Sequence, residues 1–330
     1  MAGNGGGIAV ASTFTGQNSN FADLGGSFFL KNLGDGSGGA IYFDKGAKVA
    51  ALTGDVIFQD NLINNNVGIS LNSDGESRSN GLYFANFDNN GMAAIGAAEN
   101  CTFWNYDGVC GNRDASSNQH KPQLTVQINP DSKQGGTVLF DRYRSDIWFE
   151  TTTGATVSYG TMVLQNGASF GAGESNFCQV APNSGPFNLG SNATLRIAYG
   201  QDIKRYTFNE DTFKIESVTE VVPYDPLSQL SEIGAGSVVL EGKLHFILPS
   251  TVANGNIMLQ IPLGTVRIAN SATIDVGVSA CTKDRLTLLP DQSVTLLTCS
   301  DLTCDAELPV ECNGATITGV GIQSGYQFRV

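Results

Sequence analysis

Basic residues are scarce in this chain of 330 residues. Lysine and arginine number 18, against 31 aspartates and glutamates, so the formal net charge is −13. The few basic residues form no stripe along the sequence. Nucleic acid is therefore not an expected partner, and a chain of this charge is not expected to bind an anionic lipid surface.

Long apolar runs and helical periodicity are also missing. No run of 18 apolar residues occurs, so we expect no direct insertion into a membrane. Only 15% of the residues are charged, and 40 of the 330 residues are glycine. Together with many valines, threonines and asparagines, this composition is typical of short strands joined by tight turns. We expect an all-β protein, and the composition favours an extracellular or cell-surface location.

A short motif occurs three times at a fixed interval. It reads FLKN, FQDN and FDNN, with phenylalanine at positions 29, 58 and 87 and asparagine three residues later. A fixed interval of 29 residues indicates a repeated unit that must stack on its neighbours to bury its apolar face. Three short strands and three turns would fill such a unit. The predicted repeat residues are Phe29, Asn32, Phe58, Asn61, Phe87 and Asn90.

The repeat predicts a single-stranded parallel β-helix, a solenoid in which each unit forms one coil. If successive coils stack at ~4.8 Å, the spacing of hydrogen-bonded strands, the three phenylalanines form an aromatic stack inside the solenoid. The three asparagines then form a ladder of side-chain amides at a turn. We expect one continuous domain over residues 1–330 rather than two folds.

The chain divides into four parts within this predicted solenoid. Residues 1–120 carry the repeated motif, and residues 121–200 carry strands with NGA-type turns. Residues 201–235 include a stretch with ten charged residues among 32, which a solenoid core could not bury unpaired. We expect this stretch to be a long loop or hairpin that leaves the solenoid. Residues 236–330 are expected to form further coils with a cysteine-rich end.

The motifs resemble those of a known family. The segment GGAIYF, with Gly38 and Gly39, together with the FxxN motifs, resembles the GGA(I/L/V) and FxxN repeats of the polymorphic outer membrane proteins, best known from chlamydiae. The resemblance covers roughly residues 5–200. It implies a right-handed, pectin-lyase-like β-helix passenger of an autotransporter, displayed at the cell surface and often adhesive. The chain departs from the family pattern, because it has one clean GGAI motif and ends in GYQFRV without the alternating strands of a membrane barrel.

The expected function is therefore display, as an adhesin-like passenger or a structural stalk. Loops at residues 62–82, 104–120 and 201–232 would present groups to a protein or glycan on a host or neighbouring cell. Export route, ligand and oligomeric state stay open.

The alternative is a carbohydrate-active enzyme, either a polysaccharide lyase or a hydrolase. Such an enzyme needs paired carboxylates, or acidic calcium ligands beside an arginine base. The best local cluster is FDRYRSDIWFE, where strand alternation would place both arginines on one face. We expect no enzymatic activity; the candidates in the enzymatic alternative are Asp141, Arg142, Arg144 and Asp146.

No cofactor is predicted. The turns LGDGSGG (33–39) and NSDGES (72–77) contain oxygen donors, so Ca²⁺ stays open there, although neither matches an EF-hand loop or a β-roll repeat. The chain has two histidines, His120 and His245, which disfavours zinc. His245 alternates with apolar residues in KLHFIL and is expected to be a strand residue.

Seven cysteines, an odd number, occur in the chain, and three lie close together near its end. This favours local disulfides formed in an oxidising compartment, with a pairing that the sequence leaves open. The cysteines considered for disulfides are Cys101, Cys110, Cys299, Cys304 and Cys312.

Overall fold

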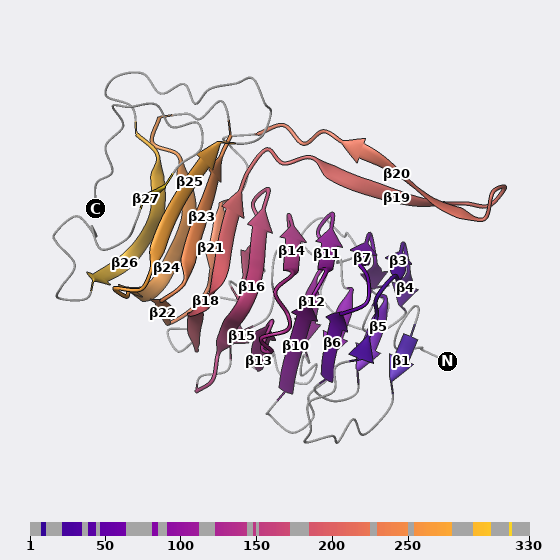
Figure 1. The fold of residues 1–330 in the computed structure, drawn as a ribbon, viewed down its shortest axis with the longest axis horizontal. Helices are drawn as coiled ribbons and strands as arrows, with labels where there is room; N and C mark the ends of the chain where they lie inside the picture. Colours follow the sequence, from indigo (N-terminus) through magenta and orange to yellow (C-terminus); the bar gives the residue numbers. More distant parts are fainter. Residues whose placement is uncertain are drawn as a thin grey trace.

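The fold is all-β, as the composition predicts. No helix occurs in the segments that the computed structural model describes, and nearly all strand pairs are parallel. The strands stack from the N-terminus towards the C-terminus in the order of the sequence (Figure 1). The described segments are residues 8–10, 22–34, 39–43, 47–63, 81–84, 91–111, 123–143, 148–149, 152–171, 185–224, 230–249, 254–278, 293–304 and 317–318.

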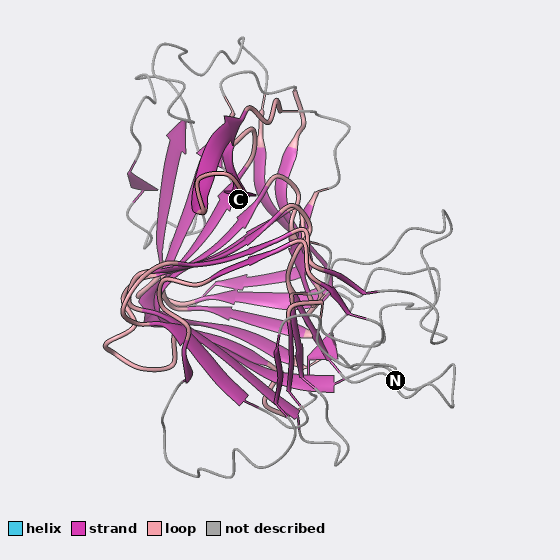
Figure 2. Cartoon of the chain, turned by 90° about the vertical axis from the view of Figure 1, so that its right-hand side faces the viewer, coloured by secondary structure: helices cyan, strands magenta, loops and turns pink. Residues whose placement is uncertain are grey.

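The chain passes repeatedly through three columns of parallel strands. Seen along the stack, the strands lie in layers that meet at a shared corner (Figure 2). The first column begins with a four-stranded sheet of β1 (Ile8–Val10), β5 (Ile41–Phe43), β9 (Leu82–Phe84) and β12 (Val109–Gly111). Further along, it contains β17 (Ser169–Phe170), β21 (Ser231–Ile233) and the first parts of β24 (Ile257–Ile268) and β26 (Thr295–Cys304).

The second column runs the whole length of the stack. Each strand pairs in parallel with the next, and two long strands, β16 and β18, bend so that they serve both this column and the third. Its strands are β2 (Ala22–Asp23), β6 (Ala47–Ala51), β10 (Gly91–Ala97), β13 (Gln123–Ile128) with β15 (Trp148–Phe149) beside it, the first parts of β16 (Ala155–Gln165) and β18 (Pro186–Ala198), β22 (Ser237–Leu240), and the second parts of β24 and β26.

The third column positions the candidate site. Its strands end at a corner of the coil, where the chain turns towards the next strand. They are β3 (Phe28–Leu30), β7 (Val56–Gln59), β11 (Asn100–Trp104), β14 (Thr137–Asp141), the second parts of β16 and β18, β23 (Lys243–Leu248), β25 (Thr273–Val278) and β27 (Ile317–Thr318); β4 (Leu33–Gly34) and β8 (Leu62–Ile63) pair just beyond the corner.

An aromatic stack forms the core of the third column. Phe29 and Phe58 stack at 4.8 Å between ring centroids, as the 29-residue repeat predicts. The stack continues with Phe103 at 4.8 Å and Phe140 at 4.9 Å. In the following coils, register places Leu164, Ile197, Phe246 and Val276 in the same line.

The third ring of the stack differs from the prediction. Phe87 lies outside the described residues, and the two faces of Phe58 are covered by Phe29 and Phe103. The intervals between stacked rings are 29 (58 − 29), 45 (103 − 58) and 37 (140 − 103) residues. Coils of one cross-section can differ in length because loops between strands absorb extra residues without disturbing the register.

The predicted amide ladder exists in its first two rungs. Asn32 Nδ2 donates to Asn61 Oδ1 at 2.8 Å, and Asn61 Nδ2 donates to the carbonyl oxygen of Phe29 at 2.9 Å. The third rung is a carboxylate, because Asn61 Nδ2 also donates to Asp107 Oδ2 at 2.6 Å. Asn90 lies outside the described residues. Of the GGAI glycines, Gly39 is buried beside β5, and Gly38 lies outside the described residues.

The disulfide prediction is wrong for two cysteines. Cys101 and Cys299 are free thiols. Cys101 points into the core between Val56 and Val138, where it packs as a small apolar side chain. The side chains of Cys110, Cys304 and Cys312 lie outside the described residues.

Cys101 is expected to be inert towards thiol reagents in the native protein. Burial raises the pKa of its thiol to about 12, so the reactive thiolate is scarce at neutral pH. Iodoacetamide labelling followed by peptide mass spectrometry should leave Cys101 unmodified without denaturant and modify it fully in urea. Rapid native labelling of Cys101 would contradict its place in the core.

Candidate functional site

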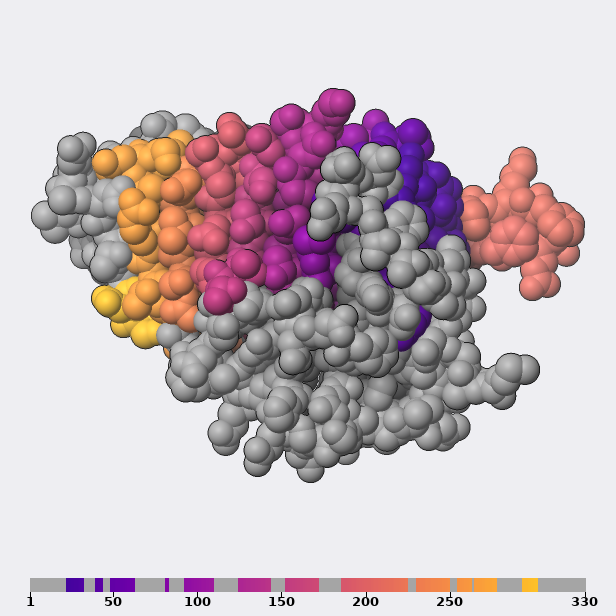
Figure 3. All heavy atoms as spheres, turned by 90° about the horizontal axis from the view of Figure 1, so that it is seen from below, coloured from indigo at the N-terminus to yellow at the C-terminus, as the bar shows by residue number. Residues whose placement is uncertain are grey.

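A hairpin departs from the stack after β18. Its strands are β19 (Ile203–Asn209) and β20 (Lys214–Glu220), which pair antiparallel. The hairpin lies along the ends of the third-column strands and runs back towards the N-terminus, and its tip projects beyond the first coils (Figures 1 and 3). The charged stretch recognised in the sequence thus returns to the surface of the earlier coils.

The corner beneath the hairpin is built from left-handed residues. Lys31, Asp60, Asn105, Arg142 and Asn166 have φ between 53° and 57°. Each of them directly follows a strand of the third column, so one left-handed residue turns the chain at the same place in five coils. Asparagine and aspartate adopt this conformation readily, but lysine and arginine do not. The left-handed Lys31 and Arg142 therefore indicate that packing against the neighbouring coils fixes the backbone of the corner.

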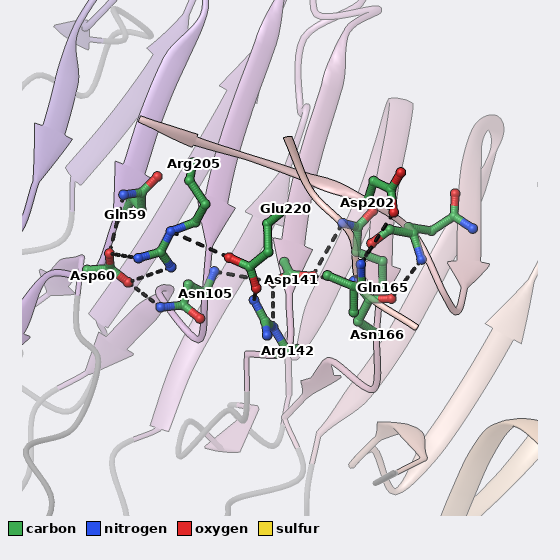
Figure 4. A network of polar contacts seen from close by, with 12 residues as sticks. Gln59, Asp60, Asn105, Asp141, Arg142, Gln165, Asn166, Asp202, Arg205 and Glu220 are labelled. Carbon is green, nitrogen blue, oxygen red and sulfur yellow. Dashed lines mark hydrogen bonds and ion pairs between the residues drawn. The ribbon is translucent and has the colours of Figure 1, made fainter. Parts of the chain in front are cut away.

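A chain of alternating charges joins the hairpin to this corner (Figure 4). Arg205 of β19 donates two hydrogen bonds to the carboxylate of Asp60, with nitrogen–oxygen distances of 2.8 and 3.3 Å. Arg205 Nε also lies 3.6 Å from Glu220 Oε2, and Glu220 Oε1 lies 3.6 Å from Arg142 Nη2. Arg142 Nε in turn donates to Asp141 Oδ2 at 2.9 Å. The five groups alternate in sign, so each cation has an anion on both sides.

Asp141, one of the two carboxylates considered for the enzymatic alternative, is a structural residue of this corner. The Asp141 side chain is fully buried and accepts hydrogen bonds from Arg142 Nε, from the backbone N–H of Asn105 at 3.3 Å, from Gln165 Nε2 at 3.3 Å and from Asn166 Nδ2 at 2.7 Å. A carboxylate with four donors and no solvent contact holds neighbouring coils together. It is not placed to receive a substrate.

The expected strand alternation beyond Asp141 does not hold. Strand β14 ends at Asp141, and Arg142 adopts the left-handed conformation, so its side chain turns towards the hairpin. The structure therefore brings Asp141 and Arg142 together as an ion pair. Arg144 and Asp146 lie outside the described residues.

A second contact holds the outer edge of β19. Gln59 Nε2 donates to the carbonyl oxygen of Tyr206 at 3.1 Å, and Gln59 Oε1 accepts from the Tyr206 backbone N–H at 2.8 Å. The Tyr206 ring packs on Phe28, with ring centroids 5.2 Å apart. Gln59 lies on the outward side of β7 and is nevertheless buried. The hairpin therefore covers the outward face of the first coils.

Beyond these contacts, apolar side chains of the hairpin are uncovered. Phe213 in the turn is 81% exposed, and Phe208, which it contacts edge to face at 6.2 Å, is 52% exposed. Val218, the register partner of Arg205, is 70% exposed. The two phenylalanines thus form an uncovered apolar contact at the projecting tip. Sequence reasoning located the charged stretch but missed these residues.

Substitution of Arg205 with glutamine is expected to release the hairpin from the corner. The variant removes the cation that joins Asp60 to Glu220, while Glu220 keeps Arg142 and Asp60 keeps its hydrogen bonds from Gln59 and Asn105, so the edge of β19 should detach more often. Chymotrypsin cleavage after Tyr206, which is held on Phe28, should accelerate at least severalfold. Cleavage after the exposed Phe213 supplies the reference rate, and Lys204→Gln, which removes an exposed cation from the same strand, is the control. Unchanged cleavage at Tyr206 would show that the ion pairs do not hold the hairpin.

The described residues contain no group of three or more metal-ligating side chains that could hold an ion. They also contain no helix of membrane-spanning length and hydropathy. The turns considered for Ca²⁺, residues 33–39 and 72–77, lie wholly or partly outside the described segments.

The chain matches no protein-family model, no curated protein and no solved structure. The site is therefore interpreted from its own geometry. The resemblance to the polymorphic outer membrane proteins thus stays a prediction based on the GGAI and FxxN motifs.

Proposed function

We propose that the chain is a surface-displayed, right-handed, single-stranded parallel β-helix that acts as an adhesin-like module. Support for the solenoid comes from the three strand columns and the in-register aromatic stack, which give a rod assembled from successive coils. Such a rod is stiff because every coil packs on its neighbours. Its task in this proposal is to hold the β19–β20 hairpin in a fixed orientation for a partner on another cell.

The proposal rests on one observation. Ion pairs of Arg205 and Glu220 hold the base of the hairpin on the corner of the stack, while its tip exposes Phe208 and Phe213. An isolated hairpin is only marginally stable in water, so a clasp gives the tip a defined shape before it meets a partner. Preorganisation of this kind reduces the conformational entropy lost on binding. The partner is proposed to be a protein or glycan of a host or neighbouring cell.

The proposal is tested by binding to immobilised extracellular-matrix proteins and to an array of neutral and acidic glycans. The wild-type chain should be retained by at least one of these surfaces. The double variant Phe208→Ser/Phe213→Ser should lose about tenfold or more in affinity, as expected for removal of aromatic anchors. Leu52→Ser removes an exposed apolar residue from a different turn and serves as the control. Equal retention of all three proteins would refute a role for the tip.

The alternative, a carbohydrate-active enzyme, makes a different prediction. A panel of polysaccharides incubated with and without Ca²⁺ should yield no new reducing or unsaturated ends if the chain is a display module. Turnover that disappears in an Arg144→Gln or Asp146→Asn variant would favour the enzyme instead. Asp141 gives this alternative no support, because its carboxylate is buried and fully hydrogen-bonded.

A further inference from the structure

A second polar cluster lies on the outward face of the third column, in the later coils. Arg196 of β18 is the register partner of His245 of β23, and His245 is the partner of Asp275 of β25. Lys243 lies two residues before His245 on the same strand and therefore on the same face. The four side chains come from three successive coils and form one continuous group.

The hydrogen bonds define the charge state of this group. Arg196 Nε donates to His245 Nδ1 at 3.3 Å, so the imidazole uses that nitrogen as an acceptor and is neutral. Burial and the charge of Arg196 lower the pKa of His245, which agrees with this assignment. His245 Nε2 lies 3.8 Å from Asp275 Oδ2, while Lys243 Nζ lies 2.6 Å from the same oxygen. Asp275 thus pairs most closely with Lys243, and its charge also acts on Arg196 and His245.

Arg196 is the less engaged of the two cations. Within the described part of the chain it forms no ion pair, and its one hydrogen bond goes to a neutral ring. The charge of Asp275 acts on Arg196 from a longer distance and favours its charged form. The Arg196 side chain is half-buried, and its guanidinium is a planar fork. This geometry suits the two oxygens of a carboxylate, sulfate or phosphate. Two cations face one carboxylate here, in a chain whose net charge is −13.

The surroundings favour an anionic group carried on a hydroxyl-rich ligand. Thr194 and Thr273 flank Lys243 in the register of the neighbouring strands and are half-buried on the same face. Their hydroxyls can donate to and accept from sugar hydroxyls, and they lie two strand spacings, about 9.6 Å, apart with Lys243 between them. The cluster thus offers a fork for an oxyanion beside a row of hydroxyl groups.

We propose that Arg196, Lys243 and His245 form a binding site for an acidic oligosaccharide, with its carboxylate or sulfate group on Arg196. The site is independent of the hairpin tip, because it lies on other strands and uses charge rather than apolar contact. The ligand adds negative charge next to His245. Its binding therefore favours the imidazolium form and raises the pKa of His245.

Proton NMR of the histidine rings tests this site directly, because the chain has two histidines. We would titrate the full chain with an oligogalacturonate, a sulfated oligosaccharide, a neutral oligosaccharide of the same length, and inorganic sulfate. The His245 ring signal, assigned with His245→Gln, should move saturably with an acidic oligosaccharide and should titrate at higher pH in its presence. The His120 signal is the internal reference. The two acidic ligands distinguish a carboxylate from a sulfate preference.

Variants make the assignment specific. Arg196→Gln should abolish the saturable shift, and Arg196→Lys, which keeps the charge without the fork, should weaken binding about tenfold. Arg267→Gln, on the second column, should bind like the wild type. An unmoved His245 signal with every ligand would overturn the proposal. So would an equal response to the neutral oligosaccharide, or a response to inorganic sulfate but to neither acidic oligosaccharide.

Discussion

Replacement of Phe103 with alanine is expected to destabilise the protein by about 3–5 kcal/mol, the range for deletion of a buried aromatic ring. Phe103 is fully buried and lies between the rings of Phe58 and Phe140, at 4.8 and 4.9 Å. Its removal opens a cavity in a stack whose rings are held by strand register and cannot slide together. Urea unfolding monitored by circular dichroism would measure the change.

Two control variants locate the effect in the stack. Phe213→Ala removes the same ring from a side chain that is 81% exposed and should change stability by less than about 0.5 kcal/mol. Phe103→Leu should be milder than Phe103→Ala, since Leu164 occupies the equivalent position two coils later. A loss of less than about 1 kcal/mol in Phe103→Ala would mean that the ring is not packed between its neighbours.

Stability is also expected to fall as the pH rises from about 4 to about 7, because of Asp107. Burial raises the pKa of this carboxyl from 3.8 to about 7, the hydrogen bonds from Asn61 oppose the shift, and the negative charge of Asp60 adds to it. The folded state thus binds a proton in this interval that the unfolded state has released. The stabilisation is complete below about pH 4, declines up to about pH 7 and is absent above it. Its size is on the order of 4 kcal/mol.

The Asp107→Asn variant isolates this contribution. An amide at this position can still accept both hydrogen bonds from Asn61, and it extends the ladder of Asn32 and Asn61 with a group that does not titrate. Its Nδ2 would face the backbone N–H of Gly108, so one hydrogen bond is lost at every pH. The free energy of unfolding of the wild type, relative to that of the variant, should therefore fall between about pH 4 and about pH 7. Parallel pH profiles would rule out a buried, titrating Asp107.

The sequence predicted those parts of the fold that repeat at one interval. The pairs Phe29–Phe58 and Asn32–Asn61 follow from the 29-residue spacing, because a coil without insertions keeps the same residues in line. Phe103 continues the stack after a longer coil, and nothing in a single sequence marks how many residues an intervening loop takes up. For the same reason, the third rung of the ladder is Asp107.

The candidate site was less predictable because its contacts join distant parts of the chain. The charge density of residues 201–232 indicated a departure from the stack, but Arg205 and Asp60 are 145 residues apart and no local pattern connects them. Left-handed corners at Lys31 and Arg142 also have no sequence signal, since these residue types seldom adopt that conformation. Arg196, His245 and Asp275 meet only through the register of three coils.

The most direct test of the account is hydrogen exchange along the hairpin of the wild-type protein. If the corner holds β19 while the tip projects freely, amides of residues 203–209, above all Tyr206, should exchange slowly. Residues 210–213 should then exchange at the rate of an open turn. An unclasped two-stranded hairpin would be only marginally stable. Rapid exchange throughout residues 203–220 would contradict the clasp and, with it, the proposed display of the tip.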